Sequence, residues 1–198
     1  MLSAEKSLER LNEGNRRFVS GEITGLATFG PKDREQLVIG QQPFAIILGC
    51  SDSRVPIELL FDQGFGDLFV IRIAGNIVAR SQLGSVEYAI QELGVKLVVV
   101  MGHAHCGAVS AAITASSDGV VPNAEHLNYV VEKIKPSLLL DGDNQEITLD
   151  NCIRSNTRRS VQCLISESAI IKKHAEQNDI CILPAHFSIN TGEVEFLD

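Results

Sequence analysis

Three short runs of mainly apolar residues stand out in the first half of the chain. They cover residues 44–49, 67–73 and 97–102 and are rich in the branched and aromatic side chains that favour β-strands. Strands without regular polar alternation are typically buried on both faces, as in a parallel sheet covered by helices. The pattern therefore predicts three buried parallel strands.

Segments with helical spacing of apolar residues lie before, between and after these strands. The predicted helices cover residues 4–19, 32–38, 55–60, 81–93, 107–113 and 147–176. The first is amphipathic, with Leu8, Leu11 and Phe18 on one face. The 81–93 helix is followed by Gly94, a residue typical of the position just after a helix. The last is expected to be mainly one long helix that starts near Asp150.

The C-terminal end has the pattern of a β-hairpin. Residues 180–183 and 185–189 are strand-like and are joined through Pro184. Residues 190–193, Asn-Thr-Gly-Glu, predict a turn into a last short strand at 194–196.

The alternation of strand and helix up to residue 113 favours the α/β class. We expect a central parallel β-sheet flanked by helices, with a C-terminal edge hairpin and an N-terminal helical arm. One domain should cover residues 1–198, because a chain of 198 residues is of a usual size for a single domain. Within it, residues 1–40 form the helical arm and residues 41–198 the α/β core.

The charge of the chain limits its partners. With 17 basic and 25 acidic side chains the formal net charge is −8, which disfavours nucleic acid and anionic membrane surfaces. The apolar runs are far shorter than the ~20 residues needed to cross a bilayer, and residues 1–6 lack the apolar core of a secretory signal. We expect a cytoplasmic protein that acts on a small molecule, which local cations such as Arg54 and Arg72 would attract.

The five cysteines do not suggest a disulfide framework, because their number is odd and none are paired as Cys-x-x-Cys. Cys152, Cys163 and Cys181 lie among apolar neighbours and are predicted to be reduced core residues. Cys50 and Cys106 differ from them, because each stands in a polar stretch that follows a predicted strand.

Those two polar stretches are residues 50–54 (CSDSR) and 103–107 (HAHCG). In open parallel sheets the ligand crevice lies beyond the carboxyl ends of the strands, so Cys50, His103 and Cys106 can converge there. Zinc binds thiolate and imidazole readily, and three protein ligands with one open position are typical of a catalytic zinc site. The sequence therefore predicts a zinc centre.

The same residues have two other interpretations. A single buried Cys is more often a small apolar residue and a single His more often a hydrogen-bonded one, so the prediction depends on their combination after two strands. Cys50 could also be the nucleophile of a phosphate-binding loop with Arg54 holding the anion. That loop would be too short and lacks the glycines that let backbone N–H groups surround a phosphate.

The motifs at residues 50–54 and 102–107 resemble those of the β-class carbonic anhydrases, zinc enzymes that interconvert carbon dioxide and bicarbonate. The resemblance extends to residues 11–18, 66–72, 85–89 and 191–194. The sequence departs from the family at Ile73, where Asn is more common, and at His105, where a smaller or acidic residue is usual.

This resemblance implies one Zn²⁺ per chain, held by Cys50, His103 and Cys106, and reversible hydration of carbon dioxide to bicarbonate and a proton by attack of a zinc-bound hydroxide. Asp52 is expected to accept the proton of the hydroxide in a hydrogen bond, while Arg54 keeps Asp52 ionised. A capping salt bridge is the alternative role for this pair. Asp52 is also a possible fourth zinc ligand in a closed state of the site.

The resemblance also implies a substrate pocket and an oligomer. Gln41, Phe69 and Tyr88 match residues that line the pocket in the plant-type branch of the family, although Phe69 and Tyr88 could equally be core residues. Because the family builds this pocket between two subunits, we expect a homodimer or a dimer of dimers. The N-terminal helix could then lie across a neighbouring subunit or pack on its own sheet.

Two alternative functions share these sequence features. One is hydrolysis of carbon disulfide or carbonyl sulfide at the same kind of zinc site. The other is a non-catalytic zinc module that senses bicarbonate or acts as a scaffold. Asp52, Arg54 and Gln41 favour an enzyme, because a purely structural zinc usually has a fourth Cys or His ligand.

Overall fold

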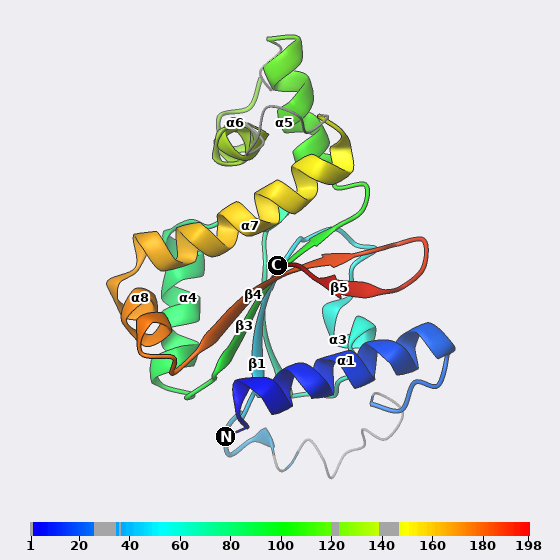
Figure 1. Ribbon diagram of the computed structural model, residues 1–198, viewed down its shortest axis with the longest axis vertical. Helices are drawn as coiled ribbons and strands as arrows, with labels where there is room; N and C mark the ends of the chain where they lie inside the picture. Colours follow the sequence, from blue (N-terminus) through cyan, green and yellow to red (C-terminus); the bar gives the residue numbers. More distant parts are fainter. Residues whose placement is uncertain (1, 26–34, 36, 120–122, 139–146) are drawn as a thin grey trace.

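A five-stranded sheet with helices on both faces forms the centre of the molecule (Figure 1). The computed structural model describes residues 2–25, 35, 37–119, 123–138 and 147–198. The predicted helix at residues 32–38 lies mostly outside this part of the chain. The strands are β1 (Ala45–Gly49), β2 (Leu68–Arg72), β3 (Leu97–His103), β4 (Cys181–Phe187) and β5 (Val194–Phe196).

The strand order is β2-β1-β3-β4-β5. The first four strands are parallel, and β5 runs antiparallel to β4 as the second strand of a hairpin at the edge. The structure therefore confirms the predicted α/β class, with a mainly parallel sheet and a C-terminal edge hairpin.

Both faces of the sheet are apolar and covered, which is why the strands lack polar alternation. On β1, Ala45 and Ile47 belong to one apolar cluster and Ile46 and Leu48 to another on the opposite face. The first face is covered by α1 (Ala4–Ser20) and α3 (Ile57–Leu60), and the second by α4 (Arg80–Gln91), α7 (Leu149–Glu167) and α8 (Ala169–Glu176).

A third apolar cluster lies beyond the carboxyl ends of the strands. It is formed by α5 (Gly107–Ser117), α6 (Glu125–Ile134), the 3₁₀ turn η2 (Lys135–Leu138) and the first turns of α7, and it includes Cys50 and Cys106. In Figure 1 α5 and α6 project beyond this end of the sheet. Among the described residues, no helix is both long enough and apolar enough to cross a membrane.

The helix α1 packs on the sheet of its own chain. Leu11 is fully buried in the first cluster, and a Cβ atom on Gly14 would overlap the backbone of Phe61, so only glycine allows this close approach. Arg17 donates a hydrogen bond from Nε to the buried carboxylate of Asp62. The sequence left two placements open for this helix, and in the structure of a single chain it packs on its own sheet.

The strand β2 differs from the prediction of a strand buried on both faces. It is paired with β1 on one side only, and Leu68, Phe69 and Val70 are all partly exposed. The exposure follows from the position of β2 at the edge of the sheet, which an apolar run cannot reveal.

The predicted long helix at residues 147–176 is wrong in one respect, because it is broken at Ser168. This residue has an extended backbone (φ −125°, ψ 117°) and separates α7 from α8. Its hydroxyl group accepts a hydrogen bond from the N–H of Ile171 and donates one to Glu87 on α4. The side chain of Ser168 therefore caps the start of α8, and its extended backbone ends α7.

The two strand-like segments around Pro184 are a single strand, β4. The carbonyl of Pro184 accepts a hydrogen bond from the N–H of Leu197, on the β5 side of the strand. Because the N and C=O of one residue point to the same side of a strand, the missing N–H of Pro184 does not interrupt the pairing with β3. A proline is therefore tolerated inside this strand.

Candidate metal centre

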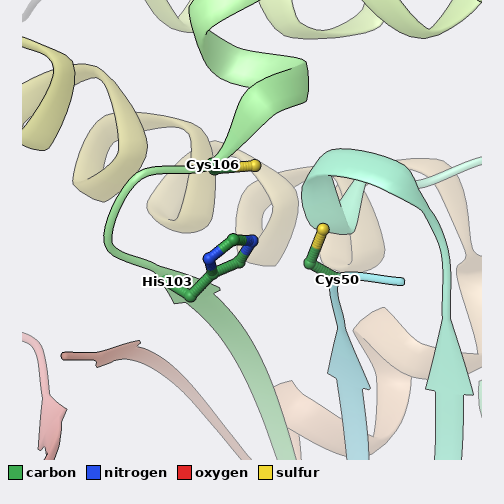
Figure 2. Close-up of side chains that lie close together, drawn as sticks. All are labelled: Cys50, His103 and Cys106. Carbon is green, nitrogen blue, oxygen red and sulfur yellow. The ribbon is translucent and has the colours of Figure 1, made fainter. Parts of the chain in front are cut away.

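Three side chains converge at the carboxyl end of the sheet. Cys50 directly follows β1, His103 ends the neighbouring strand β3, and Cys106 is the residue before α5. All three are buried, and their ligand atoms lie within 4.8 Å of one another. Figure 2 shows the side chains turned towards one common space. Elsewhere in the described ranges, no other three His, Cys, Asp or Glu residues are grouped closely enough to hold a metal ion.

The imidazole of His103 provides a test of whether these residues suit a metal. Its Nδ1 atom lies 2.9 Å from the carbonyl oxygen of Ala104, which places the ring proton there. Its Nε2 atom is buried and has no hydrogen-bond partner. A buried lone pair without a donor is costly, and a metal ion held together with the two sulfur atoms would remove that cost. This donor set fits zinc.

The two cysteines differ in acidity because they interact directly. A hydrogen bond from Cys106, opposed by burial and assisted by the backbone N–H groups of Asp52 and Gly75, lowers the pKa of Cys50 to about 4. The same interaction with Cys50, together with burial, raises the pKa of Cys106 above its ordinary value. In the absence of a cation the pair therefore holds one negative charge, and a bound metal ion would stabilise the second thiolate.

An ionised carboxylate lies beside these three side chains. Arg54 donates from Nε to Oδ1 of Asp52 at 2.9 Å and from Nη2 to Oδ2 at 2.7 Å, and its backbone N–H donates to Oδ1 at 3.0 Å. The hydrogen bonds from Arg54 hold the pKa of Asp52 far below its ordinary value. Oδ2 of Asp52 lies 3.9 Å from Nε2 of His103. Arg54 also donates to the carbonyl of His105 at 3.2 Å, which connects the two polar loops.

Arg72 fixes the loop that carries Cys50 and Asp52. Its Nε donates to the carbonyl of Cys50 at 3.1 Å and its Nη2 to the carbonyl of Asp52 at 2.6 Å. These contacts depend on the pairing of Gly49 with Arg72 across β1 and β2. The sequence suggested Arg72 as a cation that attracts substrate, whereas the structure directs its guanidinium to the backbone.

The predicted pocket residues do not join this cluster within one chain. Gln41 is exposed and precedes β1, whereas Cys50 follows it, and a five-residue strand spans roughly 16 Å. Phe69 and Tyr88 contact each other, with ring centroids 6.1 Å apart, and Tyr88 is 48% exposed. Both lie on the β2 edge of the molecule, on β2 and α4.

The three remaining cysteines are free, as predicted. Cys152 is buried and Cys163 and Cys181 are half-buried, and burial raises the pKa of each thiol. Their raised pKa values favour the neutral thiol, which agrees with a packing role.

Comparisons with known proteins agree on one kind of protein. A sequence family described as carbonic anhydrase matches residues 45–194. Carbonic anhydrase 2 of Mycobacterium tuberculosis is 38% identical over 188 residues, covering 95% of this chain and 90% of that protein. The carbonic anhydrase of Mycolicibacterium smegmatis is 37% identical over 185 residues, covering 93% and 89%.

Solved structures with a similar fold belong to the same kind of protein. The β-carbonic anhydrase CcaA has a TM-score of 0.74 and 26% identity, with coverage of 96% of this chain and 95% of that one. A tetrameric β-carbonic anhydrase of Sordaria macrospora has a TM-score of 0.72 and 26% identity, with coverage of 85% and 87%.

Proposed function

Because the chain belongs to the family of β-class carbonic anhydrases, which catalyse the zinc-dependent, reversible hydration of carbon dioxide to bicarbonate and a proton, we propose roles for individual residues in this reaction. Cys50, His103 and Cys106 hold one zinc ion per chain. The observation that carries this assignment is the buried, unpartnered Nε2 of His103 beside two sulfur atoms. When bound, zinc lowers the pKa of a water molecule and so supplies the nucleophile for carbon dioxide.

Asp52 orients the nucleophile. As an ionised carboxylate it can only accept hydrogen bonds, and its Oδ2 lies 3.9 Å from Nε2 of His103 while it accepts from Arg54 at 2.7 Å. A hydroxyl proton that points to Asp52 leaves the oxygen lone pair free to attack carbon. The bidentate pair with Arg54 would also hold the carboxylate away from a bound metal, so Arg54 would oppose a closed state in which Asp52 becomes a fourth ligand.

The rate of hydration should rise towards alkaline pH. A three-His zinc site brings the pKa of its water to roughly 7, and two thiolates make the metal a weaker Lewis acid, so the value here should be higher. Asp52 does not limit the profile, because its pKa lies well below its ordinary value and it is ionised across this range. Stopped-flow hydration rates between pH 6 and 9 test this expectation. A profile already flat from pH 6.5 upward would contradict it.

Gln41, Phe69 and Tyr88 complete the site of a second subunit. Two observations support this arrangement. Gln41 lies at the opposite end of β1 from Cys50, and both the edge strand β2 and Tyr88 on α4 are partly exposed. Phe69 and Tyr88 would provide an apolar wall suited to carbon dioxide, and Gln41 a donor for a bicarbonate oxygen. The enzyme is then a homodimer or a dimer of dimers.

The shared pocket predicts that two inactive variants restore each other. Cys50→Ser should remove the metal and Gln41→Ala should impair substrate binding, yet a mixed dimer contains one site with both residues intact. Co-expression of the two variants should therefore regenerate about a quarter of all sites. Activity no higher than the average of the two separate variants, or a monomer by light scattering at micromolar concentration, would contradict this arrangement.

A further inference from the structure

A chain of buried hydrogen bonds connects α7 to Cys50 through Gly75. The backbone N–H of Gly75 donates to Sγ of Cys50, with N and S 3.4 Å apart. On the other side, the carbonyl of Gly75 accepts a hydrogen bond of 2.8 Å from Nδ2 of Asn156. Asn156 lies on α7 and is only 2% exposed. The same glycine thus contacts a predicted metal ligand and a buried amide.

Gly75 occupies a position in which a larger residue would be strained. It lies in the 3₁₀ turn η1 (Ala74–Asn76) with φ 65° and ψ 22°, in the left-handed region that favours glycine. A Cβ atom there would come within 2.7 Å of Cδ1 of Ile134 and 3.2 Å of Cβ of Ala108. Because glycine has the widest conformational freedom of all residues, surrounding contacts have to fix the orientation of the Gly75 backbone.

The orientation of the Asn156 amide follows from its neighbours. Only its Nδ2 group can donate to a carbonyl oxygen, so Nδ2 faces Gly75. Its Oδ1 lies 3.5 Å from the hydroxyl of Ser137, which donates its proton at the shorter distance of 2.6 Å to the carbonyl of Ile134. The hydrogen bond of 2.8 Å from Nδ2 is therefore the contact through which the buried side chain can hold Gly75 in place.

We propose that Asn156 is a positioning residue of the metal centre, which keeps the Gly75 N–H directed at the Cys50 sulfur. This inference rests on the proposed role of Cys50 as a zinc ligand. An N–H group that donates to a thiolate withdraws charge from the sulfur and restrains its direction, and such outer contacts tune metal affinity. Asn156 acts through Gly75 and does not touch the reactants.

The variant Asn156→Leu tests this role, because leucine has a similar size and no donor. Zinc affinity, measured by competition with a chelator, should fall about tenfold, the lower end of the usual effect of outer-shell changes. In the cobalt-substituted protein the thiolate-to-metal charge-transfer band should move to longer wavelength, because a thiolate without its N–H donor gives up charge more easily.

A matched control comes from Asn15, another buried asparagine, which is 7% exposed and donates to the carbonyls of Leu60 and Gly192. Asn15→Leu should lower thermal stability but leave zinc affinity and the cobalt band unchanged. The proposal would be overturned if both variants lost zinc affinity to the same extent. It would also be overturned if the zinc affinity of Asn156→Leu stayed within twofold of that of the unaltered protein and its cobalt band did not move.

Asn156→Ala removes the amide without adding bulk and replaces the leucine variant if that protein does not fold. The unaltered protein offers a further test after substitution with ¹¹³Cd. The Gly75 amide proton should then show a coupling to the metal across the hydrogen bond, and its absence would refute the inference. Failure of the unaltered protein to bind zinc would instead overturn the proposed function.

Discussion

Replacement of Cys50 by serine is expected to remove zinc from the protein and to abolish hydration of carbon dioxide. Outer-shell changes alone cost 10–100-fold in metal affinity or activity, so loss of a ligand should reduce the rate by more than about 100-fold. Metal analysis and stopped-flow hydration rates measure both effects. Cys163→Ser is the matched control, because Cys163 is free and half-buried on α7 and should keep zinc and activity. A Cys50→Ser protein with full zinc and full activity would contradict the assignment.

Arg54→Ala should abolish most of the activity while zinc remains bound. Without its bidentate partner the Asp52 carboxylate is free to coordinate the metal, and its oxygen already lies 3.9 Å from the ligand nitrogen of His103. Loss of one such oriented group commonly costs about 100- to 1,000-fold in rate. A structure of the zinc-loaded variant should show Asp52 on the metal.

Arg54→Lys provides the control for charge alone. Lysine keeps the positive charge but cannot form the two parallel hydrogen bonds, so we expect an intermediate rate. Near-normal activity of Arg54→Ala would refute this role of Arg54. Coordination of zinc by Asp52 in the unaltered protein at alkaline pH would refute it as well.

The sequence was sufficient to predict the sheet and the convergence of Cys50, His103 and Cys106, because both signals are local. Apolar runs mark β1 and β3, and Cys50 and His103 lie at their ends. Parallel strands place their carboxyl ends together, so the pairing of β1 with β3 brings these side chains close to each other. The bond between Asp52 and Arg54 is also local, since the two residues are two positions apart.

The features that the sequence did not predict depend on contacts between distant segments. Ser168 ends a helix because its hydroxyl reaches Glu87, 81 residues away. Asn156 reaches Gly75 over the same separation, and nothing in the sequence distinguishes it from other polar residues of α7. The exposure of β2 depends on its place at the edge of the sheet, and the proposed pocket at Gln41 depends on a second subunit.

The central claim is that this chain hydrates carbon dioxide with a zinc ion held by Cys50, His103 and Cys106. The most direct measurement combines zinc content with stopped-flow hydration rates before chelation, after chelation and after zinc is added back. The account predicts one zinc per chain, loss of hydration when the metal is removed, and recovery when it returns. One zinc per chain without hydration at any pH, or hydration that persists without zinc, would contradict it.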